Sequence, residues 1–177
     1  PAVLDADALV LLARKPSLLQ RLTSRDILTP HPGEAAALLG CTTDEIQTQR
    51  RQALARLTDI SPAAVVLKGA GSLAAQGDSP QLLCPVDIPQ LSVGGSGDVL
   101  AGCAGALLAR AEHSGASALA VLGAALRLHA ATGLVCATAF PCRGNGAAEL
   151  AEALPRAWEA SHEDDFLTFD QDMTCFI

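Results

Sequence analysis

Short apolar runs alternate with longer segments of helical periodicity along this chain. Buried strands are predicted over residues 1–4, 26–28 and 64–68, which are rich in Val, Leu and Ile. Residues 72–75 and 81–84 predict a hairpin, because a turn with Gly, Asp and Pro separates them. Strands that alternate with helices are typical of an α/β sandwich with a largely parallel central sheet.

Helices are predicted between and after these strands. They cover residues 5–14, 34–39, 42–57, 97–110, 116–139 and 147–159. Gly40 ends the second helix, and Thr42 with Glu45 has the spacing of a capping box at the start of the third. We assign residues 1–160 to one domain and residues 161–177 to an acidic C-terminal tail.

Composition narrows the class of protein. The 177 residues are 50% hydrophobic and 18% charged, which indicates a globular domain with a real core. With a net charge of −7 and no basic patch, we expect no nucleic-acid partner. The apolar segment 116–139 contains Arg127 and His129, so we expect a buried helix and no membrane partner. Six scattered cysteines without a CxxC motif indicate a reduced, cytoplasmic protein.

Residues 94–105, with the sequence GGSGDVLAGCAG, place a glycine-rich loop before an apolar helix. Glycines let backbone N–H groups approach an anion, and a helix N-terminus adds unpaired N–H groups and a positive dipole. The carboxylate of Asp98 would repel a phosphate, so one hypothesis is that Asp98 moves a proton while the backbone holds the charge. The alternative is a glycine-rich turn with Asp98 as a helix cap.

A second candidate is the loop that follows the strand at 26–28. His31 lies between Pro30 and Pro32, which stiffen the loop and present the imidazole in a defined direction. The alternative is that the prolines only end the strand and start a helix. Glu34 falls in the first turn of that helix, where it acts as a cap or contacts a ligand.

Other polar side chains lie near strand ends. Lys68, before Gly69, either reaches a nucleotide phosphate as a point charge or extends to the solvent. Asp5 and Asp7 either cap the helix, which we favour slightly, or bind a cation or order water. His129 is interpreted as a core histidine.

The strand ends are expected to converge. Asp5, residues 29–34, Lys68 and residues 94–98 each lie where a strand ends or a helix begins. In open α/β sheets, ligands bind at the carboxyl ends of the strands. The sequence therefore predicts one shared site at this edge of the sheet.

Four motifs, VLDADAL, ILTPHPGE, VVLKGAGS and GGSGDVLAG, occur in this order along the chain. Together they resemble the ADP-dependent NAD(P)H-hydrate dehydratases of the ribokinase-like superfamily of small-molecule kinases. The resemblance extends from residue 1 to about residue 155 and includes GAAELAEALP at 146–155. It implies a three-layer αβα ribokinase-like sandwich with a mostly parallel central sheet. Domains of that family extend further at the N-terminus, so the resemblance also implies that the N-terminal part is missing here.

The resemblance implies repair of hydrated NADH and NADPH by loss of water, coupled to hydrolysis of ADP, with ATP as the other nucleotide. A phosphoryl group would pass to the added hydroxyl, and phosphate would then leave. Asp98 would be the catalytic base and would contact the hydrated cofactor together with His31. The implied nucleotide-binding residues are Lys68, Gly69, Ala70, Gly71, Ser72, Gly95, Ser96 and Gly97. Mg²⁺ is implied as a cofactor, with no metal ligands readable from the sequence.

Two alternatives use the same residues differently. A ribokinase-like kinase for a vitamin precursor or sugar alcohol would share the glycine loop and release a stable phosphoester. An inactive nucleotide-binding or assembly module is the alternative from another class. The resemblance also implies an NAD(P)H-hydrate epimerase, fused or separate, as a partner, and we expect a homo-oligomer because exposed apolar surface favours assembly.

Overall fold

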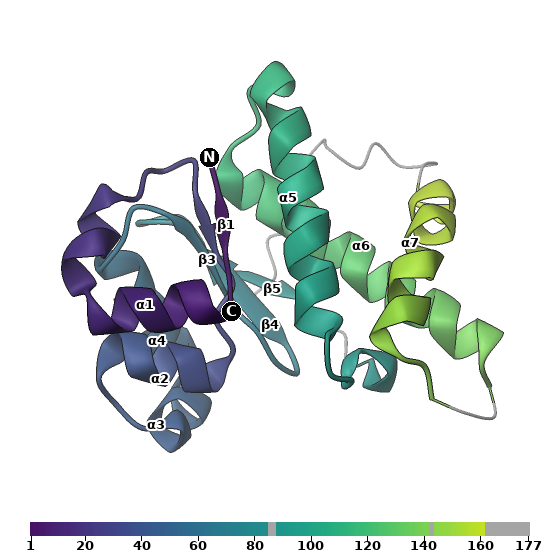
Figure 1. Cartoon of the computed structure of the whole chain (residues 1–177), viewed down its shortest axis with the longest axis horizontal. Helices are drawn as coiled ribbons and strands as arrows, with labels where there is room; N and C mark the ends of the chain where they lie inside the picture. Colours follow the sequence, from purple (N-terminus) through teal and green to yellow (C-terminus); the bar gives the residue numbers. More distant parts are fainter. Residues whose placement is uncertain (85–87, 142–143, 162–177) are drawn as a thin grey trace.

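The centre of the molecule is a five-stranded sheet with the strand order β1-β2-β3-β4-β5 (Figure 1). The structure, a computed structural model, describes residues 1–84, 88–141 and 144–161. The strands are β1 (Val3–Leu4), β2 (Ile27–Leu28), β3 (Ala64–Leu67), β4 (Ser72–Ala75) and β5 (Leu82–Cys84). β1, β2 and β3 pair in parallel, whereas β4 pairs antiparallel with both β3 and β5. The sheet is therefore mixed, and the predicted hairpin supplies its antiparallel part.

Helices cover both faces of this sheet. They are α1 (Asp7–Arg14), α2 (Pro32–Leu39), α3 (Thr43–Thr48), α4 (Arg50–Asp59), α5 (Ser96–Ser114), α6 (Ala118–Ala139) and α7 (Ala147–Ala160), with 3₁₀ turns η1 (Pro16–Arg21) and η2 (Pro89–Leu91). Figure 1 shows α1 to α4 on one side of the sheet and α5 to α7 on the other, which confirms the three-layer αβα sandwich. The acidic tail expected over residues 161–177 lies outside the described residues, apart from Ser161.

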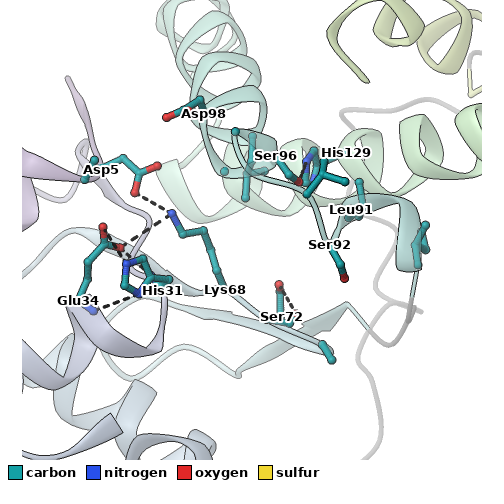
Figure 2. A pocket seen from close by; sticks show the side chains of 18 residues that line it. Asp5, His31, Glu34, Lys68, Ser72, Leu91, Ser92, Ser96, Asp98 and His129 are labelled. Atoms are coloured by element: carbon teal, nitrogen blue, oxygen red, sulfur yellow. Dashed lines mark hydrogen bonds and ion pairs between the residues drawn. The ribbon is translucent and has the colours of Figure 1, made fainter. Parts of the chain in front are cut away.

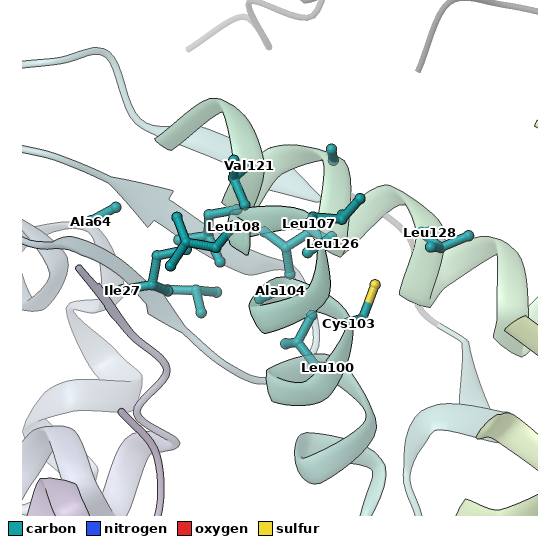
Figure 3. Close-up of a cluster of buried hydrophobic side chains, with 14 of the residues drawn as sticks. Ile27, Ala64, Leu100, Cys103, Ala104, Leu107, Leu108, Val121, Leu126 and Leu128 are labelled. Atoms are coloured by element: carbon teal, nitrogen blue, oxygen red, sulfur yellow. The ribbon is translucent and has the colours of Figure 1, made fainter. Parts of the chain in front are cut away.

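The central strand β3 explains why both faces are covered. All of its residues are fully buried, and successive side chains point to opposite faces of the sheet. Ala64 and Val66 join a cluster with α5 and α6, whereas Val65 and Leu67 join a cluster with α1, α2 and α4. Figure 3 shows the first cluster, in which sheet residues meet side chains of α5 and α6. A strand that is apolar at every position needs cover on both faces of its sheet, and the two helical layers provide that cover for β3.

The predicted helix over residues 42–57 is divided in two, which corrects the interpretation of its periodicity. Its capping box is present: the Glu45 N–H donates to Thr42 Oγ1 at 3.2 Å, and the Thr42 N–H donates to Glu45 Oε2 at 2.7 Å. The helix is interrupted at Gln49, whose backbone angles of φ −129° and ψ 47° are not helical. From the start of α4, Arg50 then reaches carbonyl oxygens at the end of β3, a long-range contact that helical periodicity does not encode.

The apolar helix α6 lies in the core. Among the helices of the described residues, it alone is long and apolar enough to cross a membrane. However, 67% of its most apolar window is buried inside the protein, as in the core helix of a globular domain. The burial agrees with the expected buried helix over residues 116–139.

Truncation of a buried leucine in α6 tests this assignment. Leu122→Ala should lower the free energy of unfolding by about 2–5 kcal/mol, because Leu122 is fully buried in the cluster with α5 and the sheet. The control is Leu134→Ala on the same helix, where 53% of the side chain is exposed and the expected change is below about 0.5 kcal/mol. Urea denaturation followed by circular dichroism measures both, and equal effects would contradict the assignment.

Candidate functional site

A pocket of about 480 Å³ opens where the carboxyl ends of β1, β2 and β3 meet the N-terminus of α5 (Figure 2). Each site residue predicted from the sequence lines it, except Gly71. The predicted residues in its wall are His31, Lys68, Gly69, Ala70, Ser72, Gly95, Ser96, Gly97 and Asp98. Asp5 and Glu34 line the same pocket, so the strand-end segments converge in the structure.

His31 is both the N-cap of α2 and part of the pocket wall. The N–H groups of Gly33 and Glu34 donate to His31 Nδ1 at 3.0 Å and 3.3 Å. In return, the His31 N–H donates to Glu34 Oε2 at 2.8 Å, which completes a capping box. Because Nδ1 accepts, the neutral ring carries its proton on Nε2. The side chain is 55% exposed, so the ring remains accessible to a ligand.

Lys68 points into the pocket rather than to the solvent. Its Nζ donates to Asp5 Oδ1 at 2.7 Å and lies 4.0 Å from Glu34 Oε2, and only 17% of its side chain is exposed. A Cβ on Gly97 would lie 3.1 Å from this Nζ, so the missing side chain makes room for the ammonium at the first turn of α5.

Asp5 is the ion-pair partner of Lys68 and not a helix cap, which corrects the sequence interpretation. The N-cap of α1 is Ala6, and no side chain caps this helix. Ala6 has φ 48° and ψ −122°, a strained conformation for a residue with a Cβ, and it lines the pocket. The Asp5 carboxylate therefore forms the long-range ion pair with Lys68 and does not cap α1.

Asp98 lies in the first turn of α5 without capping it. Among the described residues its carboxylate has no hydrogen bond or ion pair, and Figure 2 shows it beside the pocket without a partner. The N-cap is Gly95, with φ +85°, where a Cβ would lie 2.8 Å from Ala147 Cβ. The N–H groups of Gly97 and Asp98 have no acceptor in the described part of the chain. Unpaired N–H groups at a helix N-terminus are a binding site for an anion.

Sequence reasoning missed a buried pair at the rear of the pocket. His129 Nε2 of α6 lies 3.1 Å from Ser96 Oγ of α5, and both side chains are buried. Burial lowers the pKa of His129. A hydrogen bond with the backbone of Ser96 opposes this shift in the pKa, and the Lys68 ammonium adds to it. The pair is separated by 33 positions in the sequence, so no local pattern indicates it.

The pocket lacks a complete metal site. The described residues contain no group of three or more His, Cys, Asp or Glu side chains that could hold a metal ion. Asp5 is paired with Lys68, and Glu34 is bound to the His31 N–H, which leaves Asp98 as the carboxylate without a partner in the described pocket. Mg²⁺ at nucleotide sites takes one or two carboxylates plus phosphates and water. Among the described residues of the pocket, Asp98 is therefore the unpaired carboxylate available to Mg²⁺, and phosphates and water would supply the other ligands.

An αβα sandwich with unpaired helix N–H groups at the carboxyl ends of parallel strands defines a class of proteins that bind phosphorylated ligands. Within this class, the family model described as NAD(P)H-hydrate dehydratase matches residues 1–156. The chain belongs to the NAD(P)H-hydrate dehydratase family.

Two curated relatives show how much of a longer protein this chain represents. It is 44% identical over 110 residues to the bifunctional NAD(P)H-hydrate repair enzyme Nnr of Coxiella burnetii, which covers 62% of this chain and 22% of that protein. It is 44% identical over 112 residues to the ADP-dependent (S)-NAD(P)H-hydrate dehydratase of Neisseria meningitidis, which covers 62% of this chain and 38% of that protein. The chain spans less than half the length of these relatives.

Solved structures confirm the ribokinase-like fold. The ADP/ATP-dependent NAD(P)H-hydrate dehydratase from Bacillus subtilis, co-crystallized with ATP/Mg²⁺ and soaked with CoA, has a TM-score of 0.67 at 30% identity, covering 90% of this chain and 56% of that chain. A ribokinase-like superfamily protein from Enterococcus faecalis has a TM-score of 0.69 at 18% identity, covering 89% of this chain and 52% of that chain.

The buried His129 predicts a sensitivity of the fold to acid. Because burial lowers the folded pKa of His129 below the value of about 6.5 in the unfolded chain, the stability from neutral His129 is lost as the pH falls through the folded pKa. When the pH falls from about 7 to about 5, the free energy of unfolding should fall less for His129→Gln than for the wild type. The two slopes should differ by at most about 1.4 kcal/mol per pH unit. Urea denaturation across this range measures it. The control is His113→Gln at an exposed position, and parallel curves for His129→Gln and wild type would contradict the prediction.

Proposed function

We propose that this chain forms the site of an ADP-dependent NAD(P)H-hydrate dehydratase that repairs hydrated NADH and NADPH in the cytoplasm. Membership of the family and the activities named for its relatives support this. The observation that carries the proposal is the carboxylate of Asp98. It has no partner among the described residues, lies at a helix N-terminus with free N–H groups, and lines the same pocket as Lys68 and His31.

In the proposed reaction, the Asp98 carboxylate accepts the proton of the hydroxyl that hydration has added to the nicotinamide ring. The hydroxyl oxygen bonds to the terminal phosphorus of ADP, and the bond from that phosphorus to the bridging oxygen breaks, which releases AMP. The ring C–O bond then breaks and phosphate leaves with the electron pair, while solvent water accepts a proton from the neighbouring ring carbon, which restores the double bond. The N–H groups of Gly97 and Asp98, with Lys68, stabilise the charge on the transferring phosphoryl group.

The ligands would approach from two sides of the pocket. His31 and Asp98 would contact the hydrated cofactor. The segment 68–72 and residues 95–97 would contact ADP, or ATP in its place, because they line the pocket or directly adjoin it. Mg²⁺, when bound, neutralises phosphate charge, and the nucleotide itself would supply most of its ligands.

Two partners belong to the same proposal. An NAD(P)H-hydrate epimerase, fused or separate, would supply the correct epimer of the substrate, and the bifunctional name of the Coxiella burnetii relative is consistent with this. Exposed apolar side chains such as Leu11 and Leu134 are consistent with a homo-oligomer.

A spectrophotometric assay tests the proposed function directly. Purified protein is given hydrated NADH or NADPH together with ADP or ATP, and the expected result is return of the absorbance of the reduced nicotinamide. An accumulating phosphoester without that absorbance would identify a small-molecule kinase instead. Absence of nucleotide binding would identify an assembly module, and nucleotide binding without either product would identify an inactive nucleotide-binding module.

Asp98→Asn should lower turnover by at least about 100-fold while leaving ADP affinity within about twofold, because the amide keeps the shape and loses the base. The control is Asp7→Asn, which changes an exposed carboxylate in the first turn of another helix, outside the pocket. Steady-state kinetics and calorimetric titration of ADP measure the two quantities. If the Asp98→Asn variant retains turnover, Asp98 is not the catalytic base.

Two substitutions at His31 separate its capping role from ligand contact. His31→Asn keeps a side-chain cap for α2, so it should fold stably yet bind hydrated NADH about tenfold more weakly, with unchanged ADP affinity. His31→Ala should show the same binding defect and also lose about 1 kcal/mol of stability. Calorimetry and urea denaturation measure both variants, and equal losses for the two ligands would mean that His31 is structural only.

A further inference from the structure

Arg50, at the start of α4, lies outside the pocket and binds the backbone of the segment that follows β3. Its Nη2 donates to the carbonyl oxygens of Leu67 at 3.1 Å, Lys68 at 3.3 Å and Gly71 at 3.3 Å. Its Nη1 donates to Gln47 Oε1 at 2.9 Å and to the Lys68 carbonyl at 3.4 Å. One side chain therefore ties together both ends of the connection between β3 and β4.

This guanidinium does not form an ordinary salt bridge. No carboxylate pairs with Arg50 among the described residues, and the group is partly buried, which lowers its pKa. A partly desolvated cation without a counter-ion is costly unless its donors are satisfied. The carbonyl oxygens of the segment satisfy them, so Arg50 and the path of this backbone depend on each other.

The contacts decide which way the peptide groups point. In a trans peptide, the carbonyl and the following N–H point in opposite directions, and the peptides of this segment are trans. Because the Lys68 carbonyl points to Arg50, the Gly69 N–H points away from it. The Gly69 carbonyl accepts from Ser72 Oγ at 3.0 Å, so it too is bound within the protein. Gly69 has φ +135°, which residues with a side chain rarely adopt, and a Cβ there would lie 3.1 Å from Arg50 Nη1.

The donors of the same segment remain free. The Lys68 N–H donates to the Pro30 carbonyl at 2.9 Å, but within the described residues the N–H groups of Gly69, Ala70 and Gly71 have no acceptor. Gly69 and Ala70 line the pocket, and the ammonium of Lys68 lies inside it. Consecutive free N–H groups beside a cation form a concavity that binds anions.

We propose that Arg50 is a positioning residue for the nucleotide. It holds the carbonyl oxygens of residues 67, 68 and 71, so that the free N–H groups of Gly69 and Ala70, which line the pocket, and the Lys68 ammonium receive a phosphate of ADP. This inference rests on the proposed function, because it takes ADP as the ligand of the pocket. Lysine cannot replace Arg50, because a single ammonium lacks the planar fork that reaches several carbonyl oxygens at once.

The experiment compares Arg50→Lys with Arg51→Lys. Arg51 follows Arg50 on α4, is exposed, and contacts another residue through its backbone carbonyl, so it is a matched control. Arg50→Lys should raise the Kd of ADP about tenfold or more, because charged hydrogen bonds that orient the segment are lost. Affinity for hydrated NADH, which this segment is not proposed to contact, should change by less than about twofold. Arg51→Lys should leave all of these unchanged, and thermal unfolding without ligand checks that both variants fold.

The outcomes separate this inference from the proposed function. ADP affinity that is unchanged in Arg50→Lys, or an equal loss of affinity for both ligands, would overturn the positioning role alone. A wild-type protein that binds no ADP would overturn the proposed function and this inference with it. If Arg50→Lys does not fold, Gln47→Ala removes one acceptor of the guanidinium at an exposed position and should raise the Kd of ADP about threefold. No rise in that variant would overturn the positioning role as well.

Discussion

The pocket of this protein depends on the placement of one ammonium group. Lys68, just beyond β3, pairs with Asp5, just beyond β1, and lies near Glu34 in α2, which follows β2. These side chains are largely buried, so loss of one partner would leave an uncompensated charge in a region of low dielectric. The pairing therefore holds the ends of the three parallel strands in one arrangement, and the absence of a side chain at Gly97 lets α5 approach the same ammonium.

This arrangement also determines which carboxylate of the pocket has no partner in the described structure. Asp5 is neutralised by Lys68, and Glu34 is engaged by the N–H of the residue that caps α2. Asp98, in contrast, is placed beside free N–H groups of a helix N-terminus without a partner in the described structure. A carboxylate that is held in place but not neutralised suits a group that accepts a proton from a bound hydroxyl.

Much of the fold follows from short-range patterns. The continuous apolar run that forms β3, the capping box of Thr42 and Glu45, and the hairpin that follows are all readable from neighbouring residues, because their causes act within a few positions. The sequence also allows the site residues to be grouped at one place, because the carboxyl ends of parallel strands lie at one edge of a sheet. The interruption at Gln49 could not be read in this way, because Arg50 just beyond it binds carbonyl oxygens of residues 17 to 21 positions away.

The sequence by itself determined the kinds of element, their order, and the strand-end segments that gather around the pocket. Only the tertiary structure decided the role of each side chain. Asp5 forms an ion pair and not a cap, His31 caps a helix while it faces the pocket, and His129 meets Ser96 across two helices. The reason is physical: a local pattern records what a residue does within one turn or strand. The partner of a buried charge or polar group is set by whichever distant segment packs against it.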